Sequence, residues 1–384
     1  MSIETKIEWT HWPDGLPGKT WNPVRGCSRV SEGCRNCYAE RQAARFSNPD
    51  SGGMTDLGYE PNGDQGVFHG FARMTKDGPR WTGRVELVES KLEEPLRTRK
   101  PARWFLNSMS DIFHESLPFE SIAAVVAVVH ACPLHTFLVL TKRVRRAREF
   151  EKWLRARGGI AKYVRSKVGR AALRHFFDIV ARFETVSGKR HRARSDPWMQ
   201  VFNAAAVEFE SAFAFPSNLL LGVSVEDQAT ADERIPELLA TPAALRFVSY
   251  EPALGPVDFE RVPLPDAYLR MNGVTGCLQT LAEKESEPDD YTYFTRKDMK
   301  LDWIIVGGES GPGARPFDIA WARSTIEQCK AAGVACFVKQ LGSYPILDPR
   351  FDRSISGATR RLRAGKGNNP SEWPEDLRVR EFPA

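Results

Sequence analysis

The sequence lacks any apolar segment long enough to cross a membrane. Its longest apolar run, IAAVVAVVHAC at 122–132, is far shorter than the roughly 20 residues that a transmembrane helix needs. No apolar stretch follows Met1, because MSIETKIEWTHW is polar and aromatic. We therefore expect a soluble, cytoplasmic protein that has no signal peptide and no membrane partner.

Cysteine is also scarce, with seven in 384 residues, an odd number. Disulfide frameworks are typical of small secreted proteins, whereas clustered cysteines in a reducing cytosol more often bind metal. Four of the seven are isolated in the sequence, and we expect each to be a small apolar residue of the core. These are Cys132, Cys277, Cys329 and Cys336.

The composition is that of a folded, enzyme-sized chain, with 42% hydrophobic residues and 10 tryptophans. The net charge is only +5, but lysine and arginine concentrate at 142–194, in KRVRRAR, KYVRSKVGRAALR and GKRHRARS. Such a region favours an anionic partner, and nucleic acid is the natural candidate. A solvated helical face with surplus basic residues is the alternative.

Short apolar runs alternate with helix-like segments over much of the chain. Runs that are too short for helices are typical of buried parallel strands. Strands are predicted at 103–111, 136–143, 218–226, 245–252, 302–311 and 335–342, with a first strand near 20–26. Helices are predicted at 118–131, 228–240 and 317–333, the last ending at Gly333.

Strands that alternate with helices predict an α/β fold with a parallel sheet. Polar residues end most of the strands, and in a (β/α) barrel the active site forms at that end. The fold class that we predict is therefore a TIM-like (β/α) barrel, full or partial, with a helical insertion. An open doubly wound sheet is the alternative, although there only the strands beside the switch point need polar ends.

The chain is predicted to be one domain over 1–384, with additions to the barrel. Residues 150–217 are expected to form a basic helical insertion, and 257–300 a polar insertion. Residues 343–384 have little periodicity and are expected to wrap around the barrel. The segment 47–83 is rich in Gly, Asp and Asn, which predicts a long loop.

Three cysteines, Cys27, Cys34 and Cys37, form a C-x6-C-x2-C pattern. The two-residue gap lets two sulfurs converge on one metal centre, and the amides of the helix expected after Cys37 favour thiolate. A structural zinc site needs a fourth ligand, and the sequence places none nearby. A cubane iron–sulfur cluster on three thiolates leaves one iron free to bind something else. The spacing alone leaves zinc and iron–sulfur open.

Several separated motifs resemble a known family. KIEWTHW, TWNPVRGCSRVSEGCRNCYAER, NSMSDIFHESLP, GVSVEDQATADERIPELL, FVSYEPALGPVD, IIVGGESGPGARPF and EWPEDLRVREFP occur in this order. They are similar to the phage-associated three-Cys-motif proteins of unknown function, which resemble the radical S-adenosylmethionine superfamily. The resemblance implies a 4Fe-4S cluster on the three cysteines, S-adenosyl-L-methionine as a second cofactor, and an electron donor. The product of that cofactor pair would be a 5′-deoxyadenosyl radical.

Polar residues and glycines at the strand ends are the remaining site candidates. Glycines after an apolar strand let the backbone approach a ligand, and serine and carboxylate groups bind its polar atoms. The predicted cofactor-binding residues are Ser108, Ser110, Asp111, Ser224, Glu226, Gly307 and Gly308. The predicted catalytic residues are Lys142, Glu251, Glu309 and Lys339.

Together these features predict a radical S-adenosylmethionine-like enzyme that acts on nucleic acid, in base modification or DNA lesion repair. A zinc-stabilised nucleic-acid-binding protein without radical chemistry is one alternative. An ordinary acid–base enzyme with a structural metal is another. In that enzyme the candidate acids and bases are Glu226, Glu251 and Glu309.

Overall fold

The computed structural model describes residues 4–47, 66–159, 215–263, 269–271, 273–274, 277–280, 294–295, 300–346 and 365–383. The chain divides into two compact units, each made of several segments. The first comprises Met1–Arg29, Cys37–Leu220 and Pro242–Ala244, and the second comprises Val30–Asn36, Leu221–Thr241 and Leu245–Ala384. No helix in the described part of the chain is long and apolar enough to span a bilayer.

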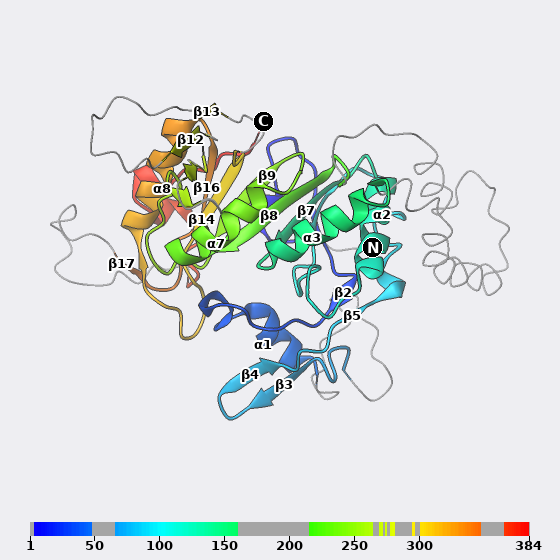
Figure 1. The fold of residues 1–384 in the computed structure, drawn as a ribbon. Coiled ribbons are helices and arrows are strands. Elements are labelled where there is room, and N and C mark those ends of the chain that lie inside the picture. The colour runs from blue at the N-terminus through cyan, green and yellow to red at the C-terminus, as the bar shows by residue number, and fades with distance from the viewer. Residues whose placement is uncertain are drawn as a thin grey trace, which may run out of the picture. The chain divides into compact units, whose positions relative to one another are not determined.

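The first unit is built on three parallel strands (Figure 1). They are β1 (Gly18–Trp21), β6 (Arg103–Leu106) and β7 (Thr136–Thr141). All four residues of β6 are buried, as in strands that are covered on both faces. The helices α2 (Phe119–Ala131) and α3 (Val144–Arg155) follow β6 and β7 along the chain. The strands and the helix predicted for this region are confirmed, and most of the insertion predicted at 150–217 lies outside the described residues.

Two small antiparallel pairs belong to the same unit. β2 (Val24–Arg25) pairs with β5 (Glu86–Leu87), and β3 (Ala72–Thr75) pairs with β4 (Gly78–Trp81). The prediction of a loop throughout 47–83 is therefore wrong over 72–81. This hairpin forms because its apolar residues Ala72 and Trp81 pack on a buried cluster beside α1 (Tyr38–Arg45).

The second unit contains four parallel strands (Figure 1). They are β8 (Leu219–Val225, of which the first two residues belong to the first unit), β9 (Arg246–Tyr250), β14 (Trp303–Gly307) and β16 (Ala335–Gln340). Every residue of the first three is buried, which explains why their sequences are mostly apolar. The strands predicted at 218–226, 245–252, 302–311 and 335–342 are confirmed.

The helices of the second unit begin and end at the residues that helix signals indicate. α7 (Gln228–Leu239) begins after Asp227, whose side chain accepts a hydrogen bond from the Thr230 backbone N–H. α8 (Ile319–Ala332) ends at Gly333, which has a φ of +66° in the left-handed region. Both predicted helices are confirmed within two residues at each end.

The remaining described parts of the second unit add short strands. The segment predicted as a polar insertion at 257–300 includes a four-stranded antiparallel sheet. Its strands are β10 (Val262–Pro263), β11 (Leu269–Met271), β12 (Cys277–Thr280) and β13 (Phe294–Thr295). β15 (Phe317–Asp318) pairs with β17 (Pro345–Ile346). Near the C-terminus, the Val338 N–H donates to the Val379 carbonyl at 2.9 Å, so the last residues lie along β16.

The principal sheet follows the order β1-β6-β7-β8-β9-β14-β16. The predicted α/β class with a parallel sheet is confirmed within each unit. A doubly wound sheet reverses its strand order at a switch point, and the described strands of this sheet show no reversal. The sequential order is compatible with a partial (β/α) barrel.

Candidate functional site

The described residues place the predicted site residues in two groups, one in each unit. Cys27 and Cys37 belong to the first unit and Cys34 to the second. All three cysteines are partly buried. Cys37 is the residue before α1, so the helix predicted after it is confirmed. Among the described residues, no group of three or more His, Cys, Asp or Glu side chains is arranged to hold a metal ion.

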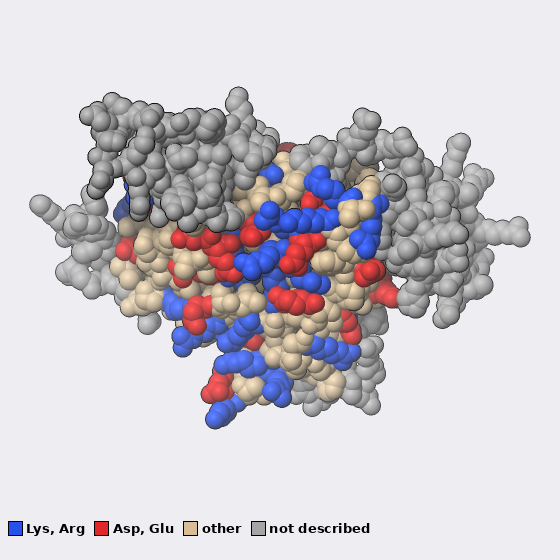
Figure 2. Space-filling view, in the orientation of Figure 1, with Lys and Arg blue, Asp and Glu red and all other residues tan. Residues whose placement is uncertain are grey.

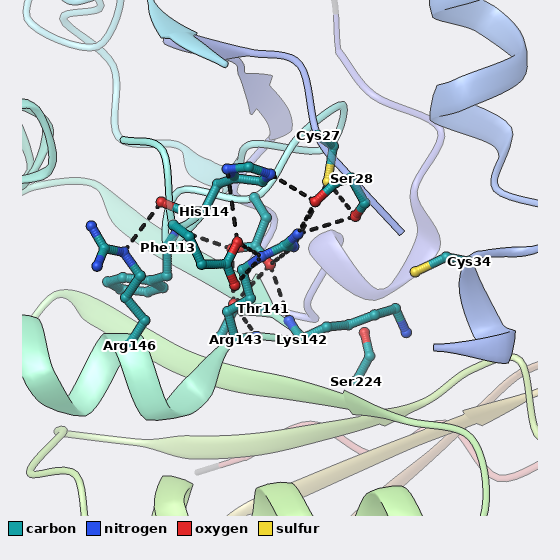
Figure 3. Close-up of polar contacts among 12 residues, drawn as sticks. Cys27, Ser28, Cys34, Phe113, His114, Thr141, Lys142, Arg143, Arg146 and Ser224 are labelled. Atoms are coloured by element: carbon teal, nitrogen blue, oxygen red, sulfur yellow. Dashed lines mark hydrogen bonds and ion pairs between the residues drawn. The ribbon is translucent and has the colours of Figure 1, made fainter. Parts of the chain in front are cut away.

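Arg143 is the centre of the first group (Figure 3). It follows β7, and only 6% of the residue is exposed. Its guanidinium donates to Asp111 at 3.2 Å, to a Glu115 oxygen at 2.8 Å and to the Ser28 hydroxyl at 2.7 Å. Its Nη1 also lies 3.8 Å from the Cys27 Sγ. We call Cys27, Ser28, Asp111, His114, Glu115, Thr141 and Arg143 the Arg143 group.

The Arg143 group places a permanent positive charge beside one thiol. Burial disfavours a buried cation, but the charges of Asp111 and Cys27 and the Glu115 hydrogen bond outweigh it and raise the pKa of Arg143. The guanidinium therefore stays protonated at any physiological pH. A cation at this distance favours the thiolate form of a cysteine.

His114 and Asp111 fix the position of this charge. The His114 Nε2 lies 2.8 Å from the Ser28 hydroxyl, and the ring is buried. Burial, with repulsion from Arg143, lowers the pKa of His114, so the ring is neutral near pH 7. Asp111 accepts from the Thr141 hydroxyl at 2.8 Å and from the Lys142 backbone N–H at 3.2 Å, as well as from Arg143. These contacts join the end of β7 to the segment after β6.

The second group surrounds the segment Val30–Asn36, which we call the Cys34 loop. Its first anchor is Glu226, of which only 1% is exposed. One oxygen of this carboxylate accepts from the Ser31 hydroxyl at 3.1 Å, and the other from Arg234 at 3.1 Å. Gly33 passes so close that a Cβ there would lie 2.3 Å from a Glu226 oxygen. Only glycine lets the loop approach this carboxylate.

Glu309 is the second anchor of the Cys34 loop. It accepts from the Asn36 side-chain amide at 3.0 Å and from the Arg315 guanidinium at 2.8 Å. Arg315 also donates to the Glu32 carbonyl at 2.9 Å. Burial alone would raise the pKa of Glu309, but hydrogen bonds from Arg315 and Asn36 outweigh it and lower the pKa. The carboxylate is therefore ionised at neutral pH. It binds the loop directly at Asn36, after Cys34, and through Arg315 at Glu32, before Cys34.

The other predicted catalytic pair, Glu251 and Lys339, also lies in the second unit. The Lys339 ammonium is 3.2 Å from the Glu251 carboxylate, which also accepts from the Ser249 hydroxyl at 3.2 Å. Gly307 packs closely on this pair, because a Cβ there would lie 2.6 Å from a Glu251 oxygen. A Cβ on Gly308 would lie 2.6 Å from the Leu341 carbonyl. Close packing accounts for both glycines, and their contact with a cofactor stays a prediction.

The predicted serines form hydrogen bonds with other groups of the protein. The Ser108 hydroxyl donates to the Asn22 side chain at 3.2 Å, and the Ser110 hydroxyl donates to the Val24 carbonyl at 2.8 Å. The Ser224 carbonyl accepts from Arg234 at 2.8 Å, and the residue is buried. Lys142 is partly buried, and its backbone N–H contacts Asp111. None of these contacts tests the cofactor-binding or catalytic roles that the sequence predicts.

Asn107, the first polar residue after β6, is a further candidate for the site. It follows β6 with a φ of +58°, and only 3% of it is exposed. Within the described residues, neither atom of its side-chain amide has a hydrogen-bond partner. A buried amide without partners is rare and costly, and it marks a place for a ligand or an ordered water.

The contacts that three arginines make with site residues could not be predicted from the sequence. Arg234 and Arg315 bind the carboxylates of Glu226 and Glu309, and Arg143 contacts Cys27. Spacing alone is too weak a signal for such contacts, although Arg315 follows its acid by six residues and Arg234 follows its acid by eight. The isolated cysteines behave as predicted where they are described, since Cys132, Cys329 and Cys336 are buried. The side chain of Cys277 lies outside the described residues.

Comparison with known proteins identifies a family. The family model described as "Protein of unknown function (DUF5131)" matches residues 4–371. The chain belongs to this family. No curated protein and no solved structure matches it. The DUF5131 match covers nearly the whole chain, and it adds no activity, so the resemblance to radical S-adenosylmethionine enzymes and the phage association stay predictions.

Proposed function

We propose that this DUF5131 protein is a radical S-adenosylmethionine-like iron–sulfur enzyme that acts on nucleic acid, built on a partial (β/α) barrel. The observation that supports it most is the set of contacts around the three cysteines. They are partly buried, one contacts a buried arginine, and another is in a loop that two carboxylates bind. The sequential strand order agrees with the barrel.

The donor chemistry of these residues suits a cluster. Thiolates are the usual ligands of iron–sulfur clusters, and Cys27, Cys34 and Cys37 would bind three irons of a 4Fe-4S centre. When bound together with S-adenosyl-L-methionine, and supplied with one electron by a donor, such a centre would provide reductive cleavage of the sulfonium C–S bond, which gives methionine and a 5′-deoxyadenosyl radical. Arg143 would offset negative charge on the thiolates, and the anchors Glu226 and Glu309 would position the Cys34 loop.

The polar residues at the strand ends would bind and orient the other reactants. Asn107 would add an amide that both donates and accepts, beside the predicted Ser108, Ser110 and Asp111. Lys339 and Glu251 form a partly exposed ion pair that would donate a proton to a substrate or accept one from it. The nucleic-acid substrate is inferred from the basic sequence at 142–194. The described part of this region includes the helix α3, whose basic residues are Arg145, Arg146, Arg148, Lys152 and Arg155.

Anaerobic purification with metal analysis tests the proposal. After reconstitution with iron and sulfide, we expect about four irons and four sulfides per chain. Cys27→Ala, Cys34→Ala and Cys37→Ala should each lose most of the iron and the visible absorption. The buried Cys132→Ala is the matched control and should retain both. With a reductant, the wild-type protein should convert S-adenosyl-L-methionine to 5′-deoxyadenosine.

Two outcomes would contradict the proposal. One is tightly bound zinc that iron and sulfide do not replace, as the zinc-stabilised alternative requires. The other is iron that survives all three substitutions, which would show that other residues are the ligands.

A further inference from the structure

The β3–β4 hairpin carries like charges at positions where they destabilise the pairing of its two strands. Its antiparallel register places Arg73 directly opposite Arg80. Like charges at directly opposite positions of two strands repel and destabilise the pair. Lys76 lies in the turn between the strands and adds a third positive charge. Among the described residues, none of these three side chains forms an ion pair with a carboxylate.

The two faces of the hairpin differ in what they contact. Successive side chains of a strand point to opposite faces, so Ala72 and Trp81 lie on one face and Arg73 and Arg80 on the other. Ala72 and Trp81 belong to the cluster beside α1, together with Phe46 and Phe68. The arginine face is therefore directed away from this core, and it belongs to a hairpin that the cluster fixes in place.

The surface around the hairpin is predominantly basic. Figure 2 shows lysine and arginine gathered where Figure 1 places β3 and β4. Arg73 and Lys76 are exposed, and Arg80 is partly exposed. Asp77, in the turn, is the acidic residue of the hairpin. A rigid surface of this kind fits a partner that supplies closely spaced negative charge.

We propose that the arginine face of the β3–β4 hairpin binds duplex DNA. Arg73, Arg80 and Lys76 contact backbone phosphates, with the two-stranded ribbon in the major groove. The major groove of B-form DNA is about 12 Å wide and admits such a ribbon. In A-form RNA the major groove is deep and narrow, so side chains cannot read it. The inference rests on the proposed nucleic-acid substrate, and it does not depend on the iron–sulfur centre.

Fluorescence anisotropy of a labelled DNA duplex, titrated with the full chain at several salt concentrations, tests this assignment. Arg73→Glu with Arg80→Glu reverses two charges on the arginine face. Arg99→Glu with Lys100→Glu is the matched control, because both residues are exposed and the change in net charge is the same. The milder pair Arg73→Gln with Arg80→Gln keeps the result interpretable if charge reversal disturbs folding. Circular dichroism and thermal unfolding check the fold of each variant.

We expect the hairpin variants to bind duplex DNA at least about tenfold more weakly than the wild type at moderate salt. The slope of log Kd against log salt should fall by about two, since each phosphate contact contributes close to one. The control pair should change affinity by less than about threefold and leave the slope unchanged.

The remaining outcomes separate this inference from the proposed function. Equal losses in the hairpin and control variants, or none in either, would overturn the inference and show that the arginines only keep the hairpin soluble. Binding of single-stranded DNA or double-stranded RNA but not of duplex DNA would overturn it too, while leaving a nucleic-acid substrate in place. A wild-type protein that binds none of the three would overturn both.

Discussion

The surroundings of Cys27 and of Cys34 differ in kind. Cys27 lies beside a buried cation, whose charge acts on the sulfur directly. Cys34 lies in a loop whose flanking residues, Ser31 and Asn36, bind two carboxylates. The charge of a neighbouring guanidinium thus acts on the Cys27 thiol, whereas the contacts of the surrounding loop fix the position of the Cys34 thiol. Acidic residues at strand ends therefore need not face a ligand, because Glu226 and Glu309 bind residues of the loop that contains Cys34.

The largest effect is expected from breaking the Glu226 anchor. Arg234→Met removes the guanidinium that lies 3.1 Å from the almost fully buried Glu226 carboxylate. Loss of one member of a buried pair typically costs about 3–5 kcal/mol. Arg323→Met is the control, because its ion pair with Asp376 is partly exposed, and we expect a loss of at most about 1 kcal/mol. Urea unfolding measures both.

Similar losses for Arg234→Met and Arg323→Met would show that the Glu226 anchor contributes no more than a surface ion pair. In that case the contrast between the two thiols would lose one of its supports.

A smaller effect is expected where the loop and Glu226 touch. Gly33→Ala would place a Cβ 2.3 Å from the carboxylate, so the loop must shift. Overpacking of this kind costs about 1–3 kcal/mol. Gly365→Ala, which has open space around it, should be nearly neutral. Because the shift moves Cys34, reconstituted iron should fall in Gly33→Ala and not in Gly365→Ala; unchanged iron would show that the position of the loop is not critical.

The smallest effects on stability are expected on acidification. They should occur in different pH ranges for His114, in the surroundings of Cys27, and for Glu309, in the surroundings of Cys34. The pKa of His114 is lowered below 6.5 by burial, so the unfolded chain takes up a proton first, and stability falls as the pH drops below that value. The pKa of Glu309 is lowered below 4.5, although burial opposes this, because Arg315 and Asn36 donate to the carboxylate. Its contribution is present above pH 4.5 and is lost at lower pH.

The measurement is urea unfolding across a pH series. His114→Gln should remove part of the decline that begins below pH 6.5, and Glu309→Gln should affect only the decline below pH 4.5. Each unit of pKa shift corresponds to about 1.4 kcal/mol. If either substitution left the pH dependence of the wild type unchanged, the assignment of that group to its window would be wrong.

The strands and helices of the principal sheet could be predicted because their signals are local. β8 and β14 are short apolar runs, and α8 ends at a glycine. The β3–β4 hairpin could not be predicted from its polar, glycine-containing sequence. Its stability depends on Trp81 packing against residues of α1 far earlier in the chain.

The sequence predicted several residues of the site, but it did not predict which other residues they contact. Glu226 and Glu309 were identified because they follow buried strands. Their contacts with the Cys34 loop join residues 195 and 273 positions apart. No local pattern records such a pairing, and a glycine that fits against a carboxylate looks like any other loop glycine until the fold is known.

The contact of the chain's final residues with β16 has a practical consequence. The Glu381 backbone N–H donates to the Cys336 carbonyl of β16 at 2.8 Å, and the Phe382 ring packs against Phe337 of β16 and Trp303 of β14. Trimming these residues would strip hydrogen-bond partners from an outer strand and uncover aromatic rings. An unprotected strand of that kind recruits other chains. Shortened versions of the protein should therefore precipitate, whatever the state of its cysteines.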